Sequence, residues 1–281
     1  MSTPATRRRV AGEIQAEFEC SQRRCCRALG FARSSVLYRS RRQEQPGLVE
    51  RLKALAAERP RFGYRRLHRM LGREGFAVNH KRVHRLYRAE GLALRRKQRK
   101  RIASVPRLVR VAPTRPNERW SMDFVSDATV NGRRFRVFNV VDEFTREALA
   151  TVVATSISGA RVARELDLLA THRGKPATIV SDNGPEFISK AMDAWAYAAG
   201  VKLHFIRPGK PVENAYVESF NGHFRDECLN MHWFTSVHDA ARIIEAWKDD
   251  YNHQRPHSSL DGLTPAEFAD KVKAGLTLSV A

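Results

Sequence analysis

The sequence predicts an α/β fold with a mixed β-sheet, preceded by small all-α modules. Two observations lead to this prediction. Up to residue 95 the chain shows helical periodicity that glycines interrupt, and after Trp120 it becomes a series of β-rich runs separated by short polar turns. The later order of elements, three strands followed by alternating helices and strands, is typical of a sheet with helices packed on its faces.

Residues 1–45 are predicted to form a partial helix-turn-helix segment. A helix over residues 21–29 ends at Gly30, and Ser34 and Ser35 are candidate N-caps for a second helix. Two helices joined by a glycine-containing turn, with exposed arginines, are typical of DNA-binding modules. The same pattern is common in other proteins, so it does not by itself establish DNA binding.

Residues 46–95 are predicted to form a second helical DNA-binding module with three helices. Leucines repeat at helical spacing, Asn79 is a candidate N-cap for the third helix, and Gly75 and Gly91 follow the last two helices. The third helix carries basic residues largely opposite its apolar face, which suits a recognition helix: Lys81, Arg82, Arg85 and Arg88. A basic helix that only faces solvent is the alternative interpretation.

The charge of the chain is concentrated at one end. Residues 1–115 hold 31 Lys and Arg against 8 Asp and Glu, whereas residues 116–281 hold 19 against 22. Such asymmetry indicates a polyanionic partner, although charge alone does not distinguish DNA from RNA. Residues 96–117 are predicted to be a basic linker, and further candidate phosphate contacts lie where the helical module meets it: Arg95, Arg96 and Lys97.

Residues 118–235 are predicted to form the α/β domain, and residues 236–281 a helical C-terminal extension. The Asn-Gly pair at 131–132 predicts a hairpin between the first two strands. Strands are expected within 119–130, 133–144, 146–158, 177–181 and 201–209, and helices within 158–174, 188–200, 214–230 and 236–252.

Three carboxylates of this domain stand at positions where α/β sheets form sites. Asp123 lies in the first strand, Asp182 follows the strand 177–181, and Glu218 lies on the helix 214–230. Converging carboxylates repel one another, and a hard divalent cation such as Mg²⁺ or Mn²⁺ relieves that repulsion. Other acidic residues compete for this role on pattern alone: Asp127, Asp142, Glu186 and Glu213.

Arg225 is a candidate substrate ligand because it follows Glu218 by seven residues, which is nearly two helical turns. It therefore shares the face of Glu218, where its cation can hold a substrate phosphate. A surface ion pair with Asp226 or Glu227 is the alternative. We also predict a DNA contact at Asn183, in the turn after Asp182.

Four stretches resemble the integrase-core transposases of bacterial insertion sequences, in the IS-three family. They are WSMDF, SDNGPEF, ENAYVESFNGHFRDECL and the tail YNHQRPHSSLDGLTPAEFA. The helical segment upstream is similar to the family's second DNA-binding module: RPRFGYRRLHRMLGREGFAVNHKRVHRLYRAEGL. Thirty-five residues separate Asp182 from Glu218, the spacing typical of the family's Asp-Asp-Glu signature. Where the family commonly has Lys, this chain has Arg225.

The resemblance implies a ribonuclease H-like core in which Asp123, Asp182 and Glu218 are catalytic and bind two Mg²⁺ ions. It implies cleavage at the terminal inverted repeats of the element and strand transfer into target DNA, without a covalent protein–DNA intermediate. It also implies an oligomer on DNA and a partner encoded by an upstream reading frame, often joined by frameshifting. The expected location is the bacterial cytoplasm, at the nucleoid.

Two other function classes compete with a transposase. A retroviral-type integrase carries a His-His-Cys-Cys zinc module, and the four cysteines lack that spacing. A catalytically idle, transposon-derived DNA-binding regulator has no use for the acidic triad. No segment predicts a secretory signal or a membrane span, so a membrane partner is not expected.

Overall fold

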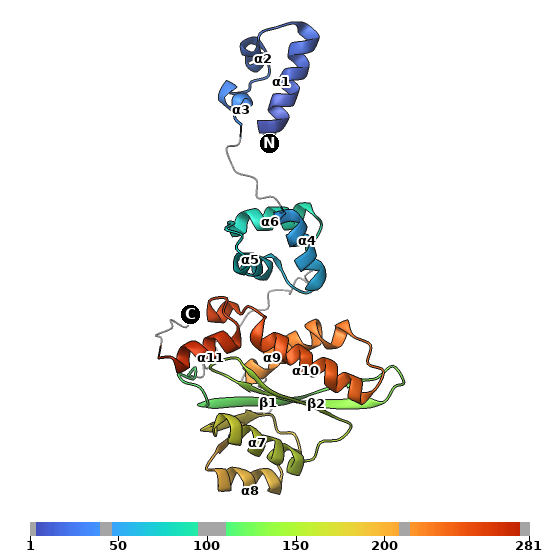
Figure 1. The fold of residues 1–281 in the computed structure, drawn as a ribbon, viewed down its shortest axis with the longest axis vertical. Helices are drawn as coiled ribbons and strands as arrows, with labels where there is room; N and C mark the ends of the chain where they lie inside the picture. The colour runs from blue at the N-terminus through green and yellow to red at the C-terminus, as the bar shows by residue number, and fades with distance from the viewer. Residues whose placement is uncertain (1–3, 40–46, 95–110, 208–213, 276–281) are drawn as a thin grey trace. The chain divides into compact units, whose positions relative to one another are not determined.

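The structure, a computed structural model, describes residues 4–39, 47–94, 111–207 and 214–275 (Figure 1). The chain divides into two compact units, residues 1–48 and 49–281. Among the described residues, no helix is both long and apolar enough to span a membrane.

The first unit contains three helices, α1 (Pro4–Phe18), α2 (Gln22–Ala28) and α3 (Arg33–Leu37). The prediction that Ser34 and Ser35 cap a helix is wrong, because α3 begins at Arg33 and both serines lie inside it. Helix α1 was not predicted, because it has little apolar periodicity and its one buried residue is Ala11.

The helical module of the second unit contains α4 (Leu48–Glu58), α5 (Tyr64–Arg73) and α6 (His80–Ala89). The Asn79 side chain accepts from the backbone N–H of Lys81, which confirms the predicted N-cap. Gly75 and Gly91 adopt the positive φ values of helix-ending glycines. The leucines predicted to form apolar faces are buried together with residues of α6: Leu48, Leu52, Leu55, Leu67, Leu71, Val83 and Tyr87.

A five-stranded mixed sheet forms the centre of the remaining chain. Its strand order is β3-β2-β1-β4-β5; β1 pairs antiparallel with β2, and β2 with β3, whereas β4 is parallel to both β1 and β5. The predicted Asn-Gly hairpin joins β1 and β2, with Gly132 at φ +76°. The strands are β1 (Arg119–Ala128), β2 (Arg134–Asp142), β3 (Ala148–Ala154), β4 (Thr178–Ser181) and β5 (Lys202–Phe205).

Helices cover both faces of this sheet, and Figure 1 shows α7 and α8 on one side and α9, α10 and α11 on the other. Two hydrophobic cores correspond to these layers, one joining the sheet to α7 and α8 and one joining it to α9 and α10. The helices are α7 (Gly159–Arg173), α8 (Lys190–Ala199), α9 (Ala215–Glu227), α10 (Val237–His253) and α11 (Pro265–Lys273), with short 3-10 turns at Leu229–Met231 and Ser258–Leu260.

The alternation of side chains along the strands decides which of them face α9. In β1, Met122 packs into the core under α7 and α8, whereas Val125 packs into the core under α9 and α10. Asp123 and Val125 are two residues apart in the strand, so the side chain of Asp123 is also on the α9 face of the sheet. In β4, Ile179 belongs to the α7 core. Asp182 is three residues after Ile179, so its side chain points to the opposite side of the sheet, which is the α9 face.

Candidate active site

Asp123 and Asp182 lie level with each other on neighbouring parallel strands. The register of β1 and β4 pairs Ser121 with Val180. Two residues further along the same register Asp123 is opposite Asp182, directly after β4 ends. Because neighbouring strands are about 4.8 Å apart, these two carboxylates lie side by side on the α9 face.

Helix α9 brings Glu218 to the same place. The helix packs against β1 and β2, and the Asn214 side chain at its N-terminus donates a 3.3 Å hydrogen bond to the Met122 carbonyl. One turn after Glu218, Asn221 Nδ2 donates to Asp123 Oδ2 at 2.7 Å. Residues three apart lie on one helix face, so Glu218 is directed toward Asp123 on the α9 face of the sheet.

The electrostatics of Asp123 reflect this convergence. Burial raises the pKa of Asp123 to about 6, and the negative charges of Asp182 and Glu218 raise it as well, against hydrogen bonds that act to lower it. Partial burial also raises the pKa of Glu218. The three carboxylates therefore interact by like-charge repulsion, which is the condition that a divalent cation relieves.

A hard cation fits the donor set of this site, because all its candidate ligand atoms are carboxylate oxygens. In the arrangement that the structure describes for residues 4–39, 47–94, 111–207 and 214–275, no three His, Cys, Asp or Glu side chains are close enough together to hold one ion.

A buried hydrogen-bond relay orients Asp123. Asn139, opposite Asp123 on β2, donates through Nδ2 to Asn221 Oδ1 at 2.7 Å. This bond occupies the Asn221 carbonyl and leaves its amide group to donate to Asp123. Sequence reasoning missed both asparagines. The available signal was the position of Asn221, one helical turn after Glu218.

The turn after β4 holds Asp182 through the backbone. The N–H of Gly184 donates to Asp182 Oδ1 at 3.1 Å, and a Cβ at position 184 would lie 3.1 Å from that same oxygen. The site therefore favours glycine there. Asn183 is exposed, and its amide donates to the Ile206 carbonyl at 2.9 Å, which joins the turn to the end of β5.

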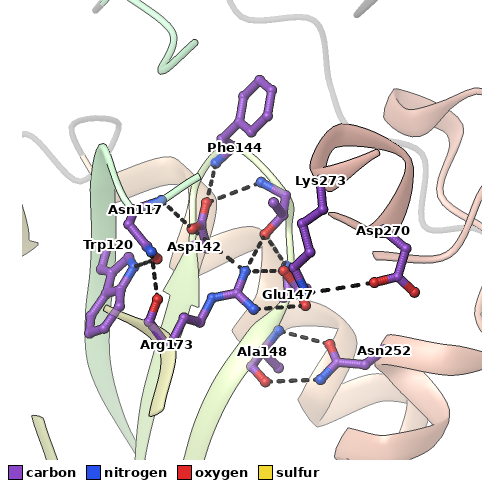
Figure 2. Close-up of polar contacts among 11 residues, drawn as sticks. Asn117, Trp120, Asp142, Phe144, Glu147, Ala148, Arg173, Asn252, Asp270 and Lys273 are labelled. Carbon is purple, nitrogen blue, oxygen red and sulfur yellow. Dashed lines mark hydrogen bonds and ion pairs between the residues drawn. The ribbon is translucent and has the colours of Figure 1, made fainter. Parts of the chain in front are cut away.

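Asp142 has a structural role at the far end of β2, as Figure 2 shows. Its buried carboxylate accepts backbone N–H groups from Asn117 at 2.9 Å, Phe144 at 2.8 Å and Thr145 at 3.1 Å. Arg173 lies 3.9 Å away. These bonds stabilise the turn between β2 and β3 and use the oxygens that a metal would need.

The remaining competing acids differ in their surroundings. Glu186 forms an ion pair with Arg136, whose guanidinium lies 4.0 Å from the centre of the Phe124 ring. Asp127 lies near the outer end of β1 and accepts the N–H of Ala128. Glu213 lies outside the described residues.

The predicted DNA contacts occupy exposed or partly exposed positions where the structure describes them. Arg225 is exposed on α9, and neither alternative ion pair forms, because Asp226 pairs with Arg61 and Glu227 with Arg255. On α6, Arg82 is partly exposed and the other three basic residues are exposed: Lys81, Arg85 and Arg88. Arg95, Arg96 and Lys97 lie outside the described residues.

Models of known protein families match most of the chain. Two models described as integrase core domains match residues 113–211 and 199–265. A model described as an HTH-like domain matches residues 42–100. Together these matches cover the basic helical region and the α/β region that carries the carboxylates.

Proteins of bacterial insertion elements are similar along nearly the whole chain. An uncharacterized 31.7 kDa protein of IS407 from Burkholderia multivorans is 52% identical over 93% of this chain and 95% of its own length. An uncharacterized 39.2 kDa protein of IS476 from Xanthomonas euvesicatoria is 44% identical, covering 95% and 77%. The putative transposase InsK of IS150 from Escherichia coli is 28% identical, covering 87% and 92%.

Among solved structures, a chain of the simian T-cell lymphotropic virus intasome in complex with PP2A regulatory subunit B56 gamma has a similar fold. The TM-score is 0.51 with 16% sequence identity, over 78% of this chain and 74% of that chain. At this identity the likeness concerns the fold alone. It confirms the ribonuclease H-like core with a mixed sheet that the sequence predicts.

Proposed function

The chain belongs to the integrase-core transposases of bacterial insertion sequences, in the IS-three family, and from this membership we propose that it cleaves DNA at the ends of its element and joins them to target DNA. The observation that carries this proposal is geometric: the register of β1 and β4 sets Asp123 level with Asp182, and α9, which carries Glu218, is bonded to Asp123 through Asn221. A fold that only bound DNA would gain nothing from three repelling carboxylates on one face of the sheet.

The proposed cofactor is a pair of Mg²⁺ ions, for which Mn²⁺ can substitute, held by Asp123, Asp182 and Glu218. Two such ions, when bound, activate the attacking oxygen and stabilise the leaving oxygen of a phosphodiester. The protein's own contribution is orientation. Asn221 fixes the Asp123 carboxylate and the Gly184 N–H fixes that of Asp182, while Arg225 is available to hold a substrate phosphate.

We propose that the helices of residues 1–95 recognise the ends of the element and that the α/β domain cleaves and joins the DNA. The HTH-like match and the charge asymmetry support DNA binding by the helical part. Further parts of the proposal are an oligomer on DNA, at the nucleoid in the bacterial cytoplasm, and an upstream-frame partner that joins this chain by frameshifting. The domain boundaries given above remain predictions.

The test is Glu218→Gln in the full chain, assayed with Mg²⁺ on a labelled duplex that carries the element's terminal inverted repeat. If the parent is inactive alone, the upstream-frame protein is added. Cleavage and strand transfer should fall by orders of magnitude, because one metal site serves both steps, while end binding and circular dichroism stay at parent values. Asp182→Asn should behave alike.

The matched control is Glu245→Gln, which changes an exposed glutamate on α10. It should leave cleavage, strand transfer and DNA binding unchanged. An active parent whose Glu218→Gln variant cuts DNA equally well would contradict the two-metal proposal. A parent that binds ends but never cuts, with Mg²⁺ or Mn²⁺ and with its partner, would favour the idle regulator.

A further inference from the structure

A cavity of about 390 Å³ lies beside α9, on a different face of the helix from Glu218. Tyr216 and Ser219 contribute to it from α9, and Arg146 from the turn after β2. The segment that follows α10 contributes four more residues: Arg255, His257, Ser258 and Ser259. At about 100° per residue, Tyr216 and Ser219 are turned well away from Glu218. The cavity is therefore separate from the carboxylate site.

Arginine charge exceeds carboxylate charge on one wall of this cavity. The buried Arg255 binds Glu227 through two hydrogen bonds, from Nε at 2.7 Å and Nη2 at 2.8 Å. Arg66 of α5 also donates to Glu227, at 2.8 Å. Two guanidinium groups thus share one carboxylate, and this group of three side chains retains a positive charge.

Arg146 adds a cation that no carboxylate binds directly among the described residues. Its guanidinium lies 4.1 Å from the centre of the Tyr216 ring, and Nη1 donates to the Glu143 carbonyl. Burial lowers its pKa. The carboxylates nearest in sequence have other partners, because Asp142 accepts three backbone N–H groups and Glu143 binds Ser121 and Arg119.

The Arg146 backbone is held in the left-handed region, at φ +64°. This conformation closes the turn between β2 and β3, where the Arg146 N–H donates to the Asp142 carbonyl at 2.9 Å. Here the conformation places the guanidinium on the Tyr216 ring at the cavity wall. The turn therefore presents a partly buried positive charge to the cavity.

The imidazoles of the cavity are neutral, so its charge comes from arginine. Burial and the charge of Arg255 lower the pKa of His257 to about 2 and that of His223 to about 4. His257 Nε2 accordingly accepts a 3.2 Å hydrogen bond from Arg255 Nη1. Arginine remains protonated throughout the physiological range, so the cavity stays cationic.

Three hydroxyl groups complete the lining, from Ser219, Ser258 and Ser259. All three residues are exposed, and none of their hydroxyls has a hydrogen-bond partner within the described part of the chain. A cavity with excess guanidinium charge and free hydroxyl donors, open to solvent, matches the chemistry of a phosphate group.

We propose that this cavity binds a backbone phosphate of DNA, with Arg146 as its principal cation and the serine hydroxyls as donors. Taking DNA as the source of the phosphate rests on the proposed function, whereas the anion site itself does not. Tyr216 and Ser219 flank Glu218 in the sequence. A phosphate bound here is therefore held by the same helix that carries the proposed catalytic glutamate.

The first experiment measures binding of the full chain to a terminal-repeat duplex as a function of salt, without divalent metal. Arg146→Gln should weaken binding by about tenfold and reduce the slope of log K against log salt by about 0.9, the value for one lost phosphate contact. Arg164→Gln, at an exposed arginine on α7, is the control and should change neither quantity.

The second experiment uses inorganic phosphate as the probe and thermal unfolding as the readout. Phosphate should raise the Tm of the parent relative to chloride at equal ionic strength, and it should raise the Tm of Arg146→Gln much less. The double variant Ser258→Ala, Ser259→Ala, which changes two exposed side chains, should also reduce the phosphate-induced rise. Tm values in chloride show whether each variant folds.

Loss of both readouts in Arg146→Gln, with Arg164→Gln unchanged, supports the proposal. A lost phosphate response with an unchanged DNA salt slope overturns the assignment to DNA and leaves a site for free anions. Equal behaviour of the two arginine variants overturns the site. Neither experiment involves cleavage, so failure of the proposed catalysis would leave both results interpretable.

Discussion

Asn221 Nδ2 donates a 2.7 Å hydrogen bond to Asp123 Oδ2, and this contact joins the helix of Glu218 to the strand of Asp123. It is itself supported by Asn139, which occupies the carbonyl oxygen of Asn221. The direction of each amide is therefore determined, and one oxygen of Asp123 is held toward the helix while the carboxylate as a whole stays beside Asp182.

We predict that Asn221→Ala lowers cleavage by about tenfold or more and raises the Mg²⁺ concentration needed for half-maximal activity, as loss of a partner that orients a metal ligand typically does. The measurement is a Mg²⁺ titration of end cleavage. Asn230→Ala, at an exposed asparagine in the 3-10 turn after α9, is the control. An unchanged Mg²⁺ dependence in Asn221→Ala would show that the relay does not orient the metal site.

The raised pKa of Asp123 predicts a pH dependence of stability in metal-free protein. The folded chain holds this proton up to about pH 6, whereas an unfolded aspartate loses it near pH 4. Between these values the folded state binds more protons, so the free energy of unfolding falls as pH rises. The total change is about 3 kcal/mol at most for a shift of this size.

Urea unfolding of the parent and of Asp123→Asn, each in EDTA at pH 4 and pH 7, measures this effect. The parent should lose more stability than the variant between the two pH values, because Asn does not titrate. Groups that do not interact with Asp123 contribute equally to both proteins and cancel in the comparison, so the difference reports Asp123 together with the carboxylates that act on it, Asp182 and Glu218. Equal pH dependence of the two proteins would mean that Asp123 has an ordinary pKa.

Much of the sheet could be predicted from sequence because its signals are local. The Asn-Gly turn, the β-rich runs and the glycines after α5 and α6 each act over a few residues. The nearness of Asp123 to Asp182 did not follow from their places in the strands, because Asp123 is in the middle of β1 whereas Asp182 follows the end of β4. It depends on the register of this parallel pair.

The relations that were missed join residues far apart in the sequence. Asn139 and Asn221 are 82 residues apart, and their contact depends on how α9 packs against β2. No periodicity encodes that geometry. Ser34 and Ser35 show a different limit, because serine is favoured before a helix but the chain turns into α3 one residue earlier.

We predict that α6 contributes to DNA binding through its exposed basic face. Replacing Arg85 and Arg88 together with glutamine should reduce the salt slope of duplex binding by about 1.8, or 0.9 for each lost phosphate contact. Thermal stability should not change, because both side chains are exposed. Fluorescence anisotropy at several salt concentrations measures the slope. A slope equal to that of the parent would indicate that α6 is a basic helix that only faces solvent.

The last prediction concerns the buried ion pair between Glu227 and Arg255, whose side chains are 8% and 2% exposed. Glu227→Gln removes the carboxylate and leaves the charges of Arg255 and Arg66 without their counterion. Removing one partner of a buried pair typically costs about 3–5 kcal/mol of unfolding free energy. Glu245→Gln, which breaks an exposed pair with Lys248, should cost less than about 1 kcal/mol.

Urea unfolding followed by tryptophan fluorescence measures these costs, because all four tryptophans of the chain lie in the α/β region, at positions 120, 195, 233 and 247. Adding Arg255→Met to Glu227→Gln should recover part of the loss, since an apolar side chain then replaces the unpaired charge. If the double variant were less stable than Glu227→Gln alone, the packing of Arg255 and its hydrogen bond to His257 would contribute more to stability than its charge does.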